Sequence, residues 1–207
     1  MTQEEIFQND LENKGVDSLV IRFSEDYLKE KSKILDLGCG SGRHSVFLAK
    51  KGHEVYALDK SKIALQKLKK HNLHNIRAYH KNILKLNFPE NYFDTVMSIM
   101  VLHHNRIINI RRYLERVKTV LKRGGYFCFS VLSSEDSRAN SGKEIEGGTR
   151  INIKDTFDSE VPHHFFEEGE LKKFLQNFKI LEMKQTLRFS AKGFGNFLHW
   201  DVIAQKK

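Results

Sequence analysis

Two acids and three glycines near the start of the chain could together bind a ligand that carries a ribose and an ammonium group. The glycines Gly38, Gly40 and Gly42 let the backbone approach a ligand where a Cβ atom would collide. Asp59 ends the next apolar run and can accept two hydrogen bonds from a ribose diol. Asp36 precedes the first glycine and suits an ammonium group better than a pyrophosphate.

Four histidines, in the adjacent pairs His103-His104 and His163-His164, are the candidates for proton transfer. A histidine can deprotonate an O–H, N–H or S–H group near neutral pH. We take His103, His104 and His163 as candidate catalytic bases and His164 as a candidate substrate contact, with polar loop residues as the alternative for each. A four-histidine metal site is also conceivable. Because adjacent histidines often splay their rings apart, we predict no metal site.

Arg43 is a further candidate for substrate binding. It falls in the first turn of a predicted helix, where the helix dipole disfavours a cation. We therefore expect an anionic partner, which is either a ligand or a surface acid.

The elements that must position these residues follow from the apolar periodicity. Residues 34–37 form a short apolar run, residues 46–49 continue at helical spacing, and residues 55–58 form a second run that ends in Asp59. This order of strand, glycine-rich turn, helix and strand is half of a nucleotide-binding βαβ unit. Later segments predict strands over 75–79, 93–100, 126–132, 178–187 and 197–205 and helices over 106–122 and 167–175.

Seven strands with helices between the first five predict an α/β fold with a doubly wound, mostly parallel sheet. The last two strands have no full helix between them, so we expect the last strand to be antiparallel. We predict one domain over residues 1–207, with a helical cap over residues 1–30 beside the binding site. The polar, glycine-bearing segment 133–160 is predicted to be a long loop that forms a lid over the site.

The glycine spacing indicates which ligand binds. A dinucleotide fingerprint, G-x-G-x-x-G, would place its third glycine at position 43, where Arg43 stands. The pattern D-x-G-x-G-x-G, with an acid closing the next strand, resembles the first motif of class I S-adenosylmethionine-dependent methyltransferases. The order of segments is most similar to the small tellurite-resistance methyltransferases. The stretches that carry this resemblance are LDLGCGSGRHSVFLAKKGHEVYALDKS, FDTVMSIMVLHH, RGGY and VPHHFFEEGELKKFL.

The resemblance implies S-adenosylmethionine as the cofactor and assigns a role to each matching position. The residues around the methionine part would be Asp36, Gly38, Cys39, Gly40 and Gly42, with the end of the fourth strand, Ser98 and Ile99, beside the ammonium group and the methyl path. The residues around the nucleoside would be Asp59, Lys60, Asn82 and Ile83. Many relatives have an acid where Asn82 stands, but an amide can still accept and donate at the adenine.

Motifs that are absent from the sequence narrow the range of possible methyl acceptors. The segment after the fourth strand reads SIMVLHH, so it lacks the Asp/Asn-Pro-Pro-aromatic run typical of amino methylation of nucleobases. It also lacks the thiol needed for methylation of cytosine carbon and the paired glutamates of protein-arginine methylation. We therefore predict methyl transfer to a small-molecule nucleophile: oxygen, nitrogen, sulfur or a heavier chalcogen.

The 207 residues carry a formal charge of +9 and include two cysteines. Dispersed lysines without a basic tail favour solvated helix faces, although a methyltransferase acting on RNA or protein is the alternative. No apolar run reaches membrane-spanning length, and two cysteines form no disulfide framework. We expect a cytoplasmic protein that is a monomer or a homodimer and does not contact a membrane.

Overall fold

The computed structural model describes residues 15–154, 156, 158–189 and 196–207. Of the predicted N-terminal cap, residues 1–14 lie outside this range, and the described part contains helix α2 (Ser18–Asp26). Asp17 caps this helix, because its side chain accepts a hydrogen bond from the N–H of Leu19 at 3.0 Å. Positions 155 and 157 of the predicted lid also lie outside the described residues.

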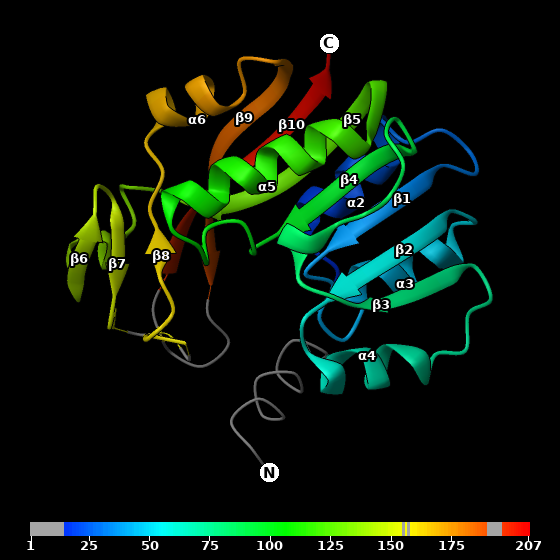
Figure 1. Cartoon of the computed structure of the whole chain (residues 1–207), viewed down its shortest axis with the longest axis horizontal. Helices are drawn as coiled ribbons and strands as arrows, with labels where there is room; N and C mark the ends of the chain where they lie inside the picture. The colour runs from blue at the N-terminus through cyan, green and yellow to red at the C-terminus, as the bar shows by residue number, and fades with distance from the viewer. Residues whose placement is uncertain (1–14, 155, 157, 190–195) are drawn as a thin grey trace.

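Within the described residues, seven strands form the central sheet in the order β3-β2-β1-β4-β5-β10-β9 (Figure 1). The strands are β1 (Lys33–Leu37), β2 (Glu54–Asp59), β3 (Ile76–His80), β4 (Phe93–Ile99), β5 (Leu121–Leu132), β9 (Phe178–Phe189) and β10 (Asn196–Lys206). The first five pair in parallel, whereas β10 pairs antiparallel with both of its neighbours. The predicted α/β class, the doubly wound sheet and the antiparallel last strand are confirmed.

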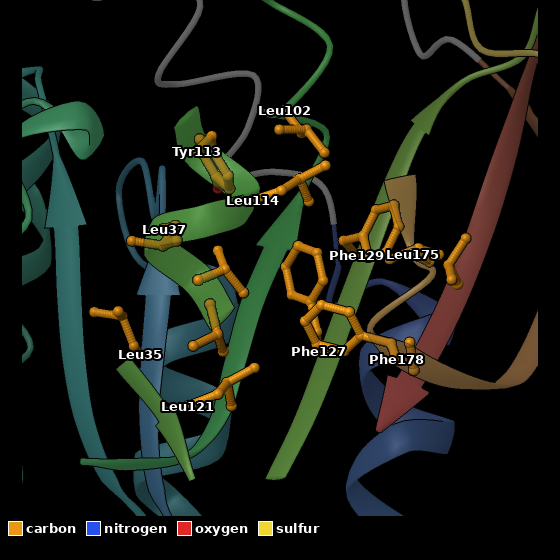
Figure 2. Close-up of a cluster of buried hydrophobic side chains, with 14 of the residues drawn as sticks. Leu35, Leu37, Leu102, Tyr113, Leu114, Leu121, Phe127, Phe129, Leu175 and Phe178 are labelled. Carbon is orange, nitrogen blue, oxygen red and sulfur yellow. The ribbon is translucent and has the colours of Figure 1, made fainter. Parts of the chain in front are cut away.

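Helices cover both faces of the sheet because the strand side chains alternate between two apolar clusters. Ile34 of β1 packs with α2 and α3 (Arg43–Lys50), and helix α4 (Lys62–Lys69) adds a smaller cluster beside β2. Leu35 packs on the opposite face, which α5 (Ile107–Val120) and α6 (Glu168–Phe174) cover. Figure 2 shows this second cluster, with Tyr113 and Leu114 of α5 above Phe127 and Phe129 of β5.

The segment between β5 and α6 is not the long loop that the sequence suggested, and that prediction was wrong. It contains the short 3₁₀ helix η2 (Ser137–Asn140) and the strands β6 (Lys143–Glu146) and β7 (Thr149–Ile151). With β8 (His163–His164), these strands form a small three-stranded sheet, drawn in yellow at the left of Figure 1. A Gly-Gly pair between two short strands is a hairpin signal, and Gly148 has the positive φ of 71° that such a turn requires. The polar composition of the segment concealed this signal.

The small sheet is attached to the start of α5. The N-cap residue of α5, Arg106, makes no capping hydrogen bond with its side chain. Instead, Glu146 of β6 accepts a hydrogen bond from the N–H of Ile107 at 2.7 Å. A carboxylate at a helix N-terminus is favoured by the helix dipole. Within the described residues, no helix is long and apolar enough to cross a membrane.

Candidate functional site

The glycine-rich loop follows β1 at the carboxyl edge of the sheet. Gly38 and Gly42 have φ angles of 72° and 94°, which favour glycine. A Cβ atom at Gly38 would collide with Val101, and one at Gly42 would collide with Leu68 of α4. The loop is therefore closely packed on both sides, and its path requires residues without a side chain at Gly38 and Gly42.

Asp59 meets this loop at the end of β2. One carboxylate oxygen accepts a hydrogen bond from the N–H of Gly40 at 2.8 Å, and the other accepts from the N–H of Ser61 at 2.8 Å. A carboxylate offers about four lone-pair sites, so two remain for a ligand diol. The structure thus brings together the acid and the glycines that the sequence singled out.

Asp36 is buried beneath the loop, where the hydroxyl of Ser45 donates a hydrogen bond to its carboxylate at 2.6 Å. Burial raises the pKa of Asp36 to about 7, with a further increase from the charge of Asp59. The hydrogen bond from Ser45 and the charge of Arg43 oppose this rise. Asp36 can therefore gain or lose its proton near neutral pH. A cationic ligand would favour the ionised form.

The nucleoside side of the predicted site is formed by backbone and amide groups. Asn82 is the N-cap of the 3₁₀ helix η1 (Ile83–Lys85), and its amide oxygen accepts from the N–H of Leu84 at 2.9 Å. One lone pair of that oxygen and the NH₂ group remain for a ligand. The carbonyl of Lys60 accepts from the ring of His80 at 2.9 Å, which connects the ends of β2 and β3.

The end of β4 turns the chain toward the glycine-rich loop. Ser98 is fully buried and accepts a hydrogen bond from the hydroxyl of Tyr113 at 2.6 Å, while Ile99 packs in the core on the other face. Met100 then adopts a left-handed conformation with φ of 63°, which is rare for a residue other than glycine. This turn directs Val101 toward Gly38 and begins the loop that carries His103 and His104.

Four histidines gather beyond β4 and β5, and we call His103, His104, His163 and His199 the histidine cluster. The ring centroid of His104 lies 4.2 Å from that of His103 and 4.7 Å from that of His163. His199 of β10 lies 6.5 Å from His103 by the same measure. The three predicted base candidates are thus brought together, and whether any of them acts as a base stays a prediction.

His164 does not belong to this cluster, and its predicted contact with a substrate stays a prediction. Its Nδ1 lies 2.8 Å from the hydroxyl of Thr149, and its Nε2 lies 2.8 Å from a carboxylate oxygen of Glu170. Neighbouring residues of a strand point to opposite sides, so His163 and His164 separate. Both ring nitrogens of His164 are engaged in holding β8 against β7 and α6.

Arg43, the other predicted substrate residue, donates a hydrogen bond to the carbonyl of Gly15 at 3.2 Å. Burial lowers the pKa of Arg43, while the charge of Asp36 raises it. Within the described residues, Arg43 forms no ion pair with a carboxylate. Its pairing with an anionic ligand stays a prediction.

Three charged residues beside the histidine cluster were not predicted from the sequence: Asp136, Arg138 and Asp158. Arg138 is buried, pairs with Asp136 at 2.8 Å and stacks over the ring of Phe197.

Burial and the neighbouring histidines hold the pKa of His103 well below its usual value, and burial lowers that of His199 to about 3. Burial raises the pKa of Asp158, but its contact with the ring of His163 and the charges of His104 and His163 lower it further, to below its usual range. His199 was also missed, since a single histidine in a strand resembles any inward-facing residue.

A separate hollow lies at the opposite, amino-terminal edge of the sheet. It is lined by residues 27–32 and by the turn around Gly124 and Gly125. None of the predicted site residues lines this hollow, so it is not the ligand site described above.

Comparisons with known proteins agree with this arrangement. Residues 34–125 match the family described as "Methyltransferase domain". Demethylmenaquinone methyltransferase of Listeria welshimeri is 32% identical over 175 residues, which cover 79% of this chain and 72% of that protein. The probable S-adenosyl-L-methionine-dependent methyltransferase TehB of Haemophilus influenzae is 28% identical over 167 residues, which cover 75% of this chain and 49% of TehB. The chain thus spans about half the length, or less, of the curated relatives that it matches first.

The solved structure of a SAM-dependent methyltransferase from Methanosarcina mazei superposes with a TM-score of 0.77 at 25% identity. The superposition covers 93% of this chain and 99% of that one. The likeness therefore extends well beyond residues 34–125, the segment that the family match covers.

Proposed function

Because the chain belongs to the class I S-adenosylmethionine-dependent methyltransferases, we propose that it transfers the methyl group of S-adenosylmethionine to a small-molecule nucleophile. The accepting atom would be oxygen, nitrogen, sulfur or a heavier chalcogen. The observation that carries the proposal is the hydrogen bond from Gly40 to Asp59, which joins the glycine-rich loop to the acid at the carboxyl edge of the sheet. Ligands of open α/β sheets bind at this edge.

Each part of the cofactor then has a partner in the chain. Asp59 would hold the ribose diol, Asn82 and Ile83 the adenine, and Asp36 the charge of the ammonium group. The residues that line the methyl path would be Ser98 and Ile99. The cofactor itself supplies the electrophile and the leaving group, so the protein contributes mainly alignment of an in-line displacement.

The acceptor would approach from the side of the histidine cluster. The segment from η2 to β8 borders this side, because the N–H of His164 donates to the carbonyl of His103 at 2.8 Å. We propose that this segment acts as a lid that covers the acceptor and excludes water during transfer. Small acceptors fit such a covered site better than an RNA strand or a protein chain.

The proposal predicts where a labelled methyl group goes. The protein should bind S-adenosylmethionine and S-adenosylhomocysteine in calorimetry and should not bind NAD. Incubation with methyl-labelled S-adenosylmethionine and a cell extract should then place the label in the small-molecule fraction. Label confined to RNA or to protein would replace the proposal by the macromolecular alternative, and saturable NAD binding without binding of either sulfur compound would refute both.

The raised pKa of Asp36 predicts that cofactor binding depends on pH. The ammonium group of S-adenosylhomocysteine favours the ionised form, so its affinity should rise from pH 6 to pH 7.5, across a pKa of about 7. Without ligand, the stability of the fold depends on pH with the opposite sign. The pKa of Asp36 in the folded state lies above the usual value of about 3.9, so the folded state loses stability as pH rises from about 4 through 7. Asp36→Asn should remove both trends, and equal slopes in the variant and the wild type would exclude Asp36 as their source.

A further inference from the structure

The contacts of His163 leave one ring nitrogen facing a carboxylate. Its Nδ1 lies 2.7 Å from the carbonyl oxygen of Val161. A carbonyl oxygen only accepts, so Nδ1 carries the proton, and in the neutral ring Nε2 carries a lone pair. That Nε2 lies 3.2 Å from Oδ1 of Asp158. Two acceptors at this distance repel each other unless a proton or a metal ion lies between them.

The position of His104 favours a metal ion over a proton. Its Nδ1 lies 3.6 Å from the second oxygen of Asp158, which is too long for a hydrogen bond. One proton on His163 satisfies only the first contact, whereas a metal ion can bind all three side chains. With metal–ligand distances of about 2.0–2.2 Å, ligand atoms of a tetrahedral zinc site lie roughly 3.3–3.6 Å apart. The separations of 3.2 and 3.6 Å, which run to the two different oxygens of Asp158, are close to that spacing.

The side chains around the three residues resemble the outer shell of a metal site. A histidine that binds a metal commonly donates its other N–H to a backbone carbonyl, as His163 does to Val161. The hydroxyl of Thr156 donates to Asp158 at 2.6 Å and holds that carboxylate in place. Nδ1 of the buried His103 has no hydrogen-bond partner within the described residues.

We propose that His104, His163 and Asp158 bind a divalent metal ion of the zinc class. Their ligand atoms all lie within 4.8 Å of one another, and rotation of a ring would bring them closer to a common centre. Two imidazoles and one carboxylate suit zinc and its neighbours among the transition metals. The expectation of no metal site rested on splayed histidine pairs. His163 and His164 do splay apart, whereas the rings of His103 and His104 lie 4.2 Å from each other, and in each pair one ring faces Asp158.

Three protein ligands leave at least one position open, as in catalytic zinc sites. This part rests on the proposed function: the open position would take an anionic oxygen or sulfur atom of the acceptor. The nearby cation Arg138 is paired with Asp136, so its repulsion of a metal ion is reduced. One ligand of the site, His104, lies five residues beyond Ile99 in the chain, on the side from which an acceptor would approach.

The test is binding of Co²⁺ and Zn²⁺ to tag-free, full-length protein after chelation. Co²⁺ should bind with a one-to-one stoichiometry and visible absorption bands, and Zn²⁺ should displace it. His163→Ala and Asp158→Asn should each weaken binding by tenfold or more, since even partners outside the first shell contribute 10–100-fold. The matched control is His71→Ala, which removes an exposed histidine and should change nothing.

Binding of S-adenosylhomocysteine by the same variants separates the possible results. Loss of metal binding with cofactor binding intact supports the site and excludes unfolding. If the wild-type protein binds neither ion stoichiometrically, or if both variants bind Co²⁺ as the wild type does, the site does not exist. Either negative result leaves the proposed methyl transfer standing, because cofactor binding is measured independently.

Discussion

Replacing Asp59 by alanine is expected to weaken the binding of S-adenosylhomocysteine by about two to four orders of magnitude. The carboxylate would accept two hydrogen bonds from the ribose, and hydrogen bonds to a charged group contribute about 1.5–3 kcal/mol each. The structure adds a second effect. Asp59 also accepts from the N–H groups of Gly40 and Ser61, so its removal loosens the loop that binds the rest of the cofactor.

Asp59→Asn separates these two effects. The amide keeps one acceptor oxygen and nearly the same shape, so the asparagine variant should bind more tightly than the alanine variant. Denaturation without ligand should show that both variants fold, with a loss of stability of about 1–3 kcal/mol for alanine. Affinity equal to that of the wild type in both variants would remove Asp59 from the site.

The second large effect is expected for Gly42→Ala, which should lower the free energy of unfolding by about 2–5 kcal/mol. A φ of 94° costs an alanine about 1–2 kcal/mol, and the new Cβ atom collides with Leu68 of α4, which adds about 1–3 kcal/mol. Gly42 is also the N-cap of α3, so relief of the collision requires a shift of the buried Leu68 side chain, of the loop or of the helix. Cofactor affinity should therefore fall along with stability.

The chain offers a matched control in Gly52→Ala. Gly52 has a nearly identical φ of 92°, but a Cβ atom there would meet no atom within 4 Å. The difference between the two variants in urea denaturation isolates the contact with Leu68. Equal losses of stability would mean that the backbone conformation alone, and not close packing of the loop, requires glycine at position 42.

Local signals were sufficient to predict the central sheet and the cofactor half of the site. The spacing from Asp36 to Gly42 and the position of Asp59 depend on residues close together in the chain, and the structure joins them through the ends of β1 and β2. The antiparallel β10 was predictable for a similar reason, since too few residues separate the two closing strands for a crossover helix. The observed strand boundaries differ from the predicted ones by only a few residues. The largest difference is at β5, which begins at Leu121 and includes Gly124 and Gly125.

The acceptor side could not be predicted because it is assembled from distant segments. Asp158 lies beside His104, although more than fifty residues separate them in the sequence. His199 lies near His103 because of the register in which β10 pairs with β5. The sequence also did not reveal which histidine of each pair turns inward. For His163 and His164, the orientation follows from the short strand β8, whose two residues point to opposite sides, and an adjacent pair of histidines gives no sign of a strand so short.

The cap that Glu146 places on α5 has a consequence for the order of folding. During synthesis, Ile107 at the start of α5 emerges 39 residues before Glu146, and until then its N–H group lacks this partner. Contacts between distant residues form late, because the intervening chain must first be ordered. The five parallel strands β1 to β5 and the glycine-rich loop can therefore form before the turn that carries His103 and His104 becomes rigid. The newly made chain would become able to hold the methyl donor before it can receive the acceptor.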